Sequence, residues 1–141
     1  MTMLAFTFLA CLLVTVSGFI NYQDLIPNGS IVPNPCRIGL WPAVGHLTAE
    51  GGTLRNTFGA DFAAAGHTWT VALCQRDSDR DGVSNGAELG DPNCRFVPGF
   101  GGSLTAPQRH PGICEPIGSA ACAWQNFSCP PIVPSPPFKQ L

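Results

Sequence analysis

Residues 77–88 read DSDRDGVSNGAE, and this stretch carries four carboxylates, at Asp77, Asp79, Asp81 and Glu88. The whole chain of 141 residues has only nine acidic and seven basic residues, so such local crowding calls for a counter-charge. A calcium-binding loop places oxygen ligands at alternate positions, a glycine where the chain reverses and a bidentate carboxylate at its end. The spacing in this stretch therefore predicts a calcium site.

Every ligand position of an EF-hand-like loop is filled. If the loop starts at residue 77, the predicted ligands are Asp77, Asp79, Asp81, the carbonyl of Val83, Asn85 and Glu88. Gly82 then stands where the chain must turn. The alternative is a solvated acidic turn that Arg76 and Arg80 partly neutralise. Because the sequence holds no second loop of this kind, we expect a solitary structural site rather than half of a calcium-sensing pair.

Apolar residues at helical spacing precede the acidic loop. They recur at steps of three and four and would form one face, made of Phe58, Phe62, Ala65, Trp69 and Leu73. Asn56 can cap the start, and Gly66 interrupts the pattern, which predicts two short helices over 57–65 and 68–75. Short strands are expected near 30–32 and 95–97. The remainder is turn-rich, with 16 Gly and 14 Pro in the chain.

The N-terminal residues 1–18 are predicted to be a secretory signal peptide. Nothing from Leu4 to Val16 is charged, and small residues follow up to Gly18. This apolar run is shorter than the roughly 20 residues that a membrane span needs, although an anchor or a buried helix is the alternative. Cleavage after Gly18 would release a secreted, extracellular chain. We expect a domain over 19–129 and a proline-rich tail over 130–141.

Cysteine usage agrees with an extracellular location. The chain has seven cysteines, and the predicted signal peptide removes Cys11. The six that remain are Cys36, Cys74, Cys94, Cys114, Cys122 and Cys129. An even number in a secreted chain predicts three disulfides, whose pairing the spacing alone leaves open. The expected fold class is a small disulfide-rich α+β domain, mostly loops and short strands around two short helices and a single EF-hand-like calcium loop.

Other motifs bear on modification and partners. Asn28 in NGS and Asn126 in NFS are acceptor sites for N-glycosylation. The net charge of −2, with Lys139 as the single lysine, gives no basic surface for nucleic acid or anionic membrane.

Three histidines suggest the main alternative function. His46, His67 and His110 could together hold a zinc or copper ion in an extracellular metal-dependent enzyme. None of them has a second histidine two or four positions away, as a ligand pair on one element would provide. The only G-x-S-x-G pattern, at residues 82–86, lies inside the predicted calcium loop and follows a predicted helix, not the strand that a nucleophile elbow requires. We therefore expect no catalytic residues.

Several motifs, taken in order, resemble one known family. They are LIPNG, VPNPC, WPAVGH, RN-x-FG-x-DFAAAGHTWT, DSD-x-DG-x-x-NG-x-ELGDPNC and HPGICEP, and they span about residues 25–116. This set resembles the temptin family of water-borne pheromone proteins of marine molluscs. The resemblance implies a small secreted protein that associates with other secreted peptides or proteins and does not turn over a substrate.

The resemblance also implies a disulfide pattern. Its cysteines map onto the first four of the mature chain and imply the pairs Cys36–Cys74 and Cys94–Cys114. Cys122 and Cys129 would then form the third pair. These last two cysteines and the proline-rich tail lie beyond the resemblance.

Overall fold

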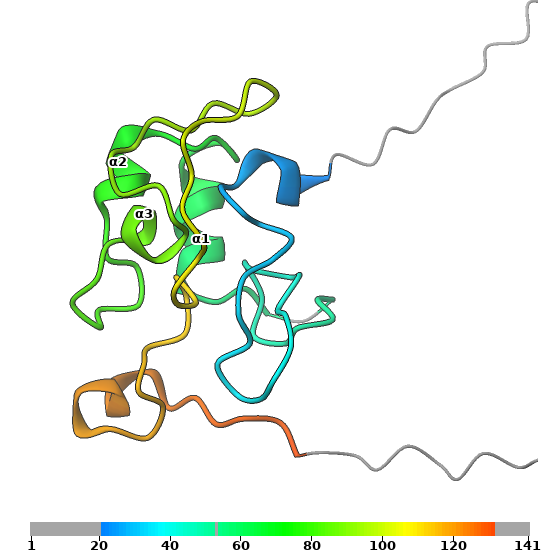
Figure 1. Cartoon of the computed structure of the whole chain (residues 1–141). Coiled ribbons are helices and arrows are strands. Elements are labelled where there is room, and N and C mark those ends of the chain that lie inside the picture. The colour runs from blue at the N-terminus through cyan, green and yellow to red at the C-terminus, as the bar shows by residue number, and fades with distance from the viewer. Residues whose placement is uncertain (1–20, 53, 132–141) are drawn as a thin grey trace, which may run out of the picture.

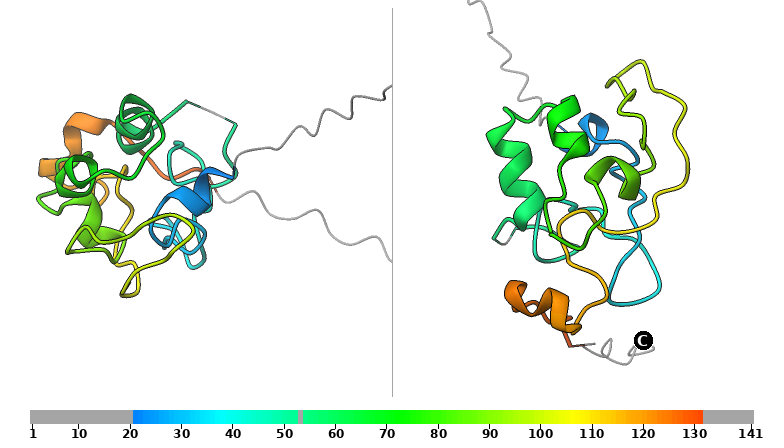
Figure 2. Two further views of the ribbon diagram at one scale, coloured as in Figure 1. Left: turned by 90° about the horizontal axis from the view of Figure 1, so that it is seen from above. Right: turned by 90° about the vertical axis from the view of Figure 1, so that its left-hand side faces the viewer.

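The computed structural model describes residues 21–52 and 54–131. The predicted signal peptide and residues 132–141 of the predicted tail lie outside the described residues. In chain order the elements are the 3-10 helix η1 (Tyr22–Leu25), the α-helices α1 (Thr57–Ala64), α2 (Val71–Gln75) and α3 (Asn85–Glu88), and the 3-10 helix η2 (Ala120–Gln125). The three α-helices gather on one side of the molecule, and η2 lies at one end (Figures 1 and 2). None of the described helices is long and apolar enough to cross a membrane.

Two helices form where the apolar pattern predicts them, although the second is shorter than expected. The side chain of Asn56 caps α1 by accepting a hydrogen bond from the Gly59 N–H at 2.8 Å. The helix ends before Gly66, whose φ of 67° suits a glycine. Thr70 then caps α2 by accepting from the Leu73 N–H at 3.1 Å, so this helix begins at residue 71 rather than 68.

The predicted apolar face lies in the core. Its members Phe58, Phe62, Trp69 and Leu73 are buried, and Ala65 packs against them. The rest of the cluster comes from the N-terminal loops, from α2 and from the end of α3: Ile26, Val32, Val44, Cys74 and Leu89. One small core thus joins the helices to the loop-rich half of the molecule.

The predicted strands near 30–32 and 95–97 are wrong. Within 21–52 and 54–131, sheet-type pairing is confined to isolated antiparallel bridges, namely Pro33 with Leu40, His46 with Arg55 and Val97 with Gly101. Proline cannot donate to a ladder, and glycines with positive φ bend the chain back after one pair. The small disulfide-rich architecture with short helices is confirmed, whereas its β component amounts to these bridges.

All six predicted cysteines are paired, but the pairing implied by the resemblance is wrong. The disulfides are Cys36–Cys129, Cys74–Cys94 and Cys114–Cys122, with Cα–Cα distances of 5.5, 5.7 and 5.5 Å. Cys74 lies on α2 and faces the chain that returns after α3, so Cys94 is its neighbour in space. The turn of η2 brings Cys122 back to Cys114, which leaves Cys36 for the C-terminal segment.

A buried carboxylate anchors the chain after α3. Asp91 is 2% exposed and accepts hydrogen bonds from Trp69 Nε1 at 2.9 Å, the Arg95 N–H at 2.8 Å and the Phe96 N–H at 3.1 Å. We call these contacts the Asp91 network. Because it joins the residue that precedes α2 to the segment that follows α3, it fixes both ends of the intervening acidic loop.

Candidate functional site

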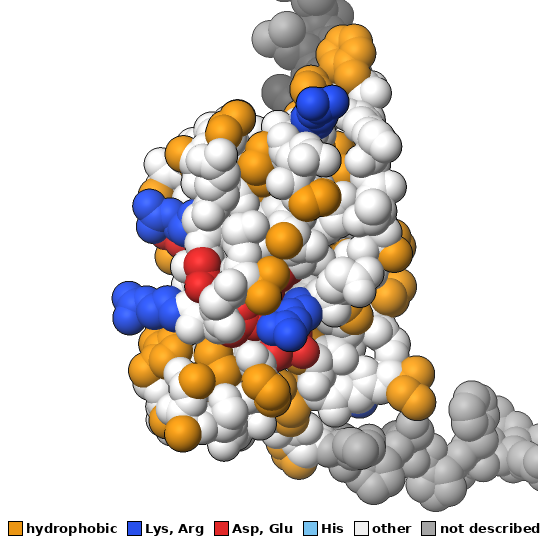
Figure 3. Space-filling view, turned by 60° about the vertical axis from the view of Figure 1, so that its left-hand side comes forward, with side chains coloured by type: hydrophobic (Ala, Val, Ile, Leu, Met, Phe, Trp, Pro, Cys, Tyr) orange, Lys and Arg blue, Asp and Glu red, His pale blue; other side chains and the backbone are white. Residues whose placement is uncertain are grey.

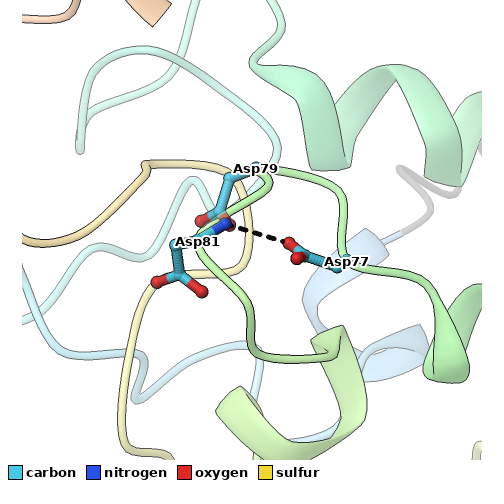
Figure 4. A group of neighbouring side chains, drawn as sticks. All are labelled: Asp77, Asp79 and Asp81. Carbon is cyan, nitrogen blue, oxygen red and sulfur yellow. Dashed lines mark hydrogen bonds between the residues drawn. The ribbon is translucent and has the colours of Figure 1, made fainter. Parts of the chain in front are cut away.

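The acidic loop connects α2 to α3, and its three aspartates converge (Figure 4). One carboxylate oxygen from each of Asp77, Asp79 and Asp81 lies within 4.8 Å of the others. The backbone N–H of Asp81 donates to Asp77 and to Asp79, at 3.2 Å each, and the Gly82 N–H donates to Asp77 at 2.9 Å. Gly82 has a φ of 94°, which places the chain reversal at the predicted glycine. The loop is therefore wound around its own carboxylates.

Glu88 on α3 completes the acidic site, the name we use for Asp77, Asp79, Asp81 and Glu88. Its side chain is fully buried, and neither carboxylate oxygen has a hydrogen-bond partner among the described residues. Asp79 is also fully buried, and its Oδ2 has no partner in the same part of the chain. Buried polar groups are nearly always paired, so unpaired carboxylate oxygens beside three further acids form an arrangement that could hold a cation.

The electrostatics of the acidic site also suit a cation. Burial, followed by the neighbouring carboxylates of Asp79, Asp81 and Asp77, raises the pKa of Glu88 to about 10. Burial and the carboxylates of Asp81 and Asp77 raise the pKa of Asp79 to about 7. Both shifts disfavour the charged forms at neutral pH. A bound divalent cation would reverse this effect by supplying the opposite charge.

One of the six predicted ligands, Asn85, has other contacts in the structure. Asn85 is fully buried; its Oδ1 accepts from the Ser78 N–H at 3.3 Å, and its Nδ2 donates to the Leu73 carbonyl at 2.8 Å. These bonds tie the loop to α2, so the amide of Asn85 positions the loop instead of facing the carboxylates. The Val83 N–H donates to Asp81 at 3.0 Å, which holds this part of the loop beside the acidic site.

Close packing of α2 on α3 sets the shape of the site. The two helices contact each other, and a side chain at Gly86 would collide with the Sγ of Cys74. Glycine at this position lets α3 approach the Cys74–Cys94 disulfide, and Glu88 on α3 lies close enough to the aspartates of the loop to interact with their charges.

Two arginines join the acidic loop to distant segments; the sequence suggested Arg80 only as a residue that neutralises an acidic turn, and it did not suggest Arg109. Arg109 donates to Asp81 at 3.1 Å; the Arg109 side chain is 42% exposed, whereas that of Asp81 is fully buried. Arg80 has a φ of 60° and stands 4.8 Å above the ring of Trp124, on η2. Figure 3 shows acidic atoms recessed between basic side chains on this face. Arg109 and Asp81 are 28 residues apart in the sequence, so no local pattern could have predicted their ion pair.

The three histidines do not come together. His46 and His67 line an open cavity of about 660 Å³, whereas His110 does not line it and packs edge-on against Trp41 at 5.2 Å. Burial lowers the pKa of His110 to about 3, which keeps its imidazole neutral. Among the described residues, the aspartates of the acidic loop are the one cluster of three or more His, Cys, Asp or Glu side chains that could hold an ion. The geometry thus gives no support to a three-histidine metal site.

The two predicted glycosylation sites differ in their surroundings. The side-chain nitrogen of Asn28, to which a glycan would attach, donates to the carbonyls of Leu89 and Thr105, each at 2.8 Å. Asn126 is exposed and ends η2. The fold therefore favours Asn126 over Asn28 as an acceptor.

Comparison with known proteins gives one consistent result. The family model described as Temptin C-terminal matches residues 16–113. The chain is 44% identical over 115 residues to Temptin of Aplysia californica, and the aligned region covers 81% of this chain and 92% of that protein. No solved structure is significantly similar to the chain. The family-model match includes the whole acidic site and ends before the Cys114–Cys122 disulfide and η2.

Proposed function

The chain belongs to the temptin family, and on that premise we propose that it is a secreted, non-enzymatic signalling or interaction protein. Its role would be that of a water-borne pheromone component that associates with other secreted peptides or proteins. The observation that carries this proposal is the 44% identity to Temptin, which extends over 92% of that protein. A similarity of this extent favours a shared mode of action.

Secretion is supported by two features of the chain. The N-terminal 18 residues have the composition of a signal peptide, and the six remaining cysteines form three disulfides. Disulfides persist in oxidising, extracellular surroundings. Since the main hydrophobic cluster of the described residues contains nine buried side chains, these crosslinks would supply much of the stability.

We further propose that the acidic site binds one calcium ion with a structural role. Support comes from Glu88, whose two buried oxygens have no hydrogen-bond partner among residues 21–52 and 54–131 and lie beside three converging aspartates. Asp77, Asp79, Asp81 and Glu88 would supply the side-chain oxygens, and the carbonyl of Val83 would complete the set. Hard oxygen donors of this kind suit calcium, and extracellular calcium near 1 mM would occupy a site of roughly 10⁻⁵ M affinity. The ion would fix α3 against α2.

The experiment that tests the proposed function is affinity capture. Purified, tagged protein would be incubated with medium conditioned by the secreting tissue, in 1 mM calcium or in chelator. We expect a secreted peptide or protein to be retained in calcium and to be retained less in chelator, because loss of the ion loosens the fold. If nothing is retained under either condition, the association role is wrong.

A second measurement separates this role from the enzymatic alternative. Elemental analysis after dialysis against a weak chelator should find no stoichiometric zinc or copper. One tightly held transition-metal ion per chain, lost in His46→Ala, would favour the metal-dependent enzyme instead. His67→Asn serves as a second variant, because asparagine tolerates the φ of 55° that this residue adopts.

A further inference from the structure

The loop formed by residues 95–102 stands out from the body of the molecule (Figure 1). Pro98 and Gly99 occupy the two central positions of a turn in which the Phe100 N–H donates to the Val97 carbonyl at 3.1 Å. Gly99 has a φ of 80°, as the third residue of a type II turn requires, and proline pre-sets the position before it. The Val97 N–H donates to the Gly101 carbonyl at 3.0 Å and closes the loop. The turn chemistry therefore defines the conformation of the tip.

The base of this loop is held as firmly as its tip. The Asp91 network binds the N–H groups of Arg95 and Phe96, and the preceding Cys94 is joined to Cys74. Phe96 packs against the hydrophobic core. A loop anchored in this way loses little conformational freedom when it binds a partner.

Large apolar side chains at the tip face solvent. Phe100 is 92% exposed and Val97 is 50% exposed. Arg95, at the base, is exposed and has no ion pair in residues 21–52 and 54–131. No acidic residue occurs between Arg95 and Arg109 in the sequence. The loop thus combines a convex apolar tip with an unpaired cation.

We propose that the 95–102 loop docks into an apolar pocket, bordered by carboxylates, on a secreted partner protein. This inference rests on the proposed association function and identifies the surface that performs it. Phe100 would fill the pocket, since aromatic side chains act as anchors at protein interfaces. Arg95 would pair with an acidic group at the rim, which would favour acidic partners over basic ones. The anchored base keeps Phe100 in position before the encounter.

A membrane is a less suitable partner for the same loop. Attachment to anionic lipid generally requires a cluster of about four to eight basic residues beside the apolar side chains. The loop offers Arg95 alone, and the whole chain carries a net charge of −2. A protein pocket needs only the shape and the single charge that the loop presents.

The test uses the protein that the wild type retains from conditioned medium, after identification by mass spectrometry and purification. Calorimetric titration would compare the wild type with Phe100→Ser, Arg95→Gln and Ile38→Ser. Ile38 is a matched control, because it is an exposed apolar residue on a different loop. We expect Phe100→Ser to weaken binding about 10- to 100-fold, Arg95→Gln about 3- to 10-fold, and Ile38→Ser to have no effect.

Three outcomes would overturn the proposal. Equal binding by Phe100→Ser and the wild type would show that partners bind elsewhere, while the proposed function would stand. Failure of the wild type to retain any protein would remove both proposals. If vesicles of phosphatidylserine and phosphatidylcholine sedimented the wild type but not Phe100→Ser, the loop would bind a membrane instead of a protein. Unchanged melting temperatures of the variants would confirm that each one folds.

Discussion

Two buried carboxylates lie three residues apart, and their surroundings are opposite. Asp91 and Glu88 are each 2% exposed or less. Asp91 accepts three hydrogen bonds, whereas neither oxygen of Glu88 has a partner in the described part of the chain. The fold thus satisfies Asp91 from its own donors. A carboxylate that is buried without donors, beside three other acids, is instead suited to a cation, as we propose for this site.

Removal of the Asp91 carboxylate should have the largest effect on stability. Asp91→Ala leaves the buried Trp69 Nε1 and two backbone N–H groups without acceptors, so we expect the free energy of unfolding to fall by about 3 kcal/mol or more. Denaturant titration in 1 mM calcium and in chelator would measure this loss. Asp24→Ala, on an exposed side chain, should change stability by less than about 0.5 kcal/mol. If Asp91→Ala lowered the free energy of unfolding only in calcium, Asp91 would belong to the same cation site as Glu88.

Removal of calcium should have the next largest effect. If the dissociation constant is near 10 μM and free calcium near 1 mM, chelation would lower wild-type stability by about 2.7 kcal/mol. Asp77→Ala and Glu88→Gln should be nearly insensitive to chelator in thermal unfolding. In chelator Glu88→Gln should be at least as stable as the wild type, because glutamine is neutral without the proton that Glu88 must take up to be buried. A wild type that melts at the same temperature in both buffers would make the loop a solvated acidic turn.

The pH dependence of stability should reveal the buried His110. Its pKa is lowered to about 3 by burial, while an unfolded histidine titrates near its ordinary value of 6.5. Between these values the unfolded chain binds more protons, so stability falls as the pH drops below about 6.5. The slope should approach about 1.4 kcal/mol per pH unit from this group. Denaturant titrations of the wild type and His67→Asn in calcium should share this slope. A flat profile between pH 6.5 and 5 would contradict the buried, neutral imidazole.

The contact between the acidic loop and η2 should contribute least. Arg80→Gln removes the cation above Trp124, and we expect a loss of about 0.5–1 kcal/mol. A double-mutant cycle with Trp124→Leu would isolate this coupling by denaturant titration. Arg37→Gln is the control, since Arg37 pairs at the surface with Glu50. A coupling energy of zero would mean that this contact does not help to hold η2, which the hydrogen bonds of Gln125 with Cys114 and Gly112 and the Cys114–Cys122 disulfide also anchor.

The sequence predicted those parts of the molecule that depend on local spacing. The apolar residues that recur every three or four positions from Phe58 to Leu73 pack into the core, as predicted. Gly82 in the acidic loop has the positive φ that its position in the loop requires. Asn56 caps α1 as its side-chain chemistry predicts. In each case the decisive interactions join residues only a few positions apart.

Features that depend on long-range contacts could not be predicted in this way. Cys36 and Cys129 are 93 residues apart, and no spacing rule distinguishes their pairing from 14 other arrangements. Asn85 has the residue type of a calcium ligand, yet its amide binds Ser78 and the Leu73 carbonyl, because α2 and α3 pack closely enough to bring these groups together. The Arg109–Asp81 ion pair likewise depends on the path of a distant segment.

Calcium titration of the metal-free protein by isothermal calorimetry tests the central contrast between the two carboxylates most directly. We predict one calcium ion per wild-type chain, binding of the same stoichiometry in Asp91→Asn, and no saturable binding in Glu88→Gln. If Glu88→Gln binds calcium as the wild type does, or if the wild type shows no saturable binding up to several millimolar, the unpaired carboxylate of Glu88 does not mark a cation site.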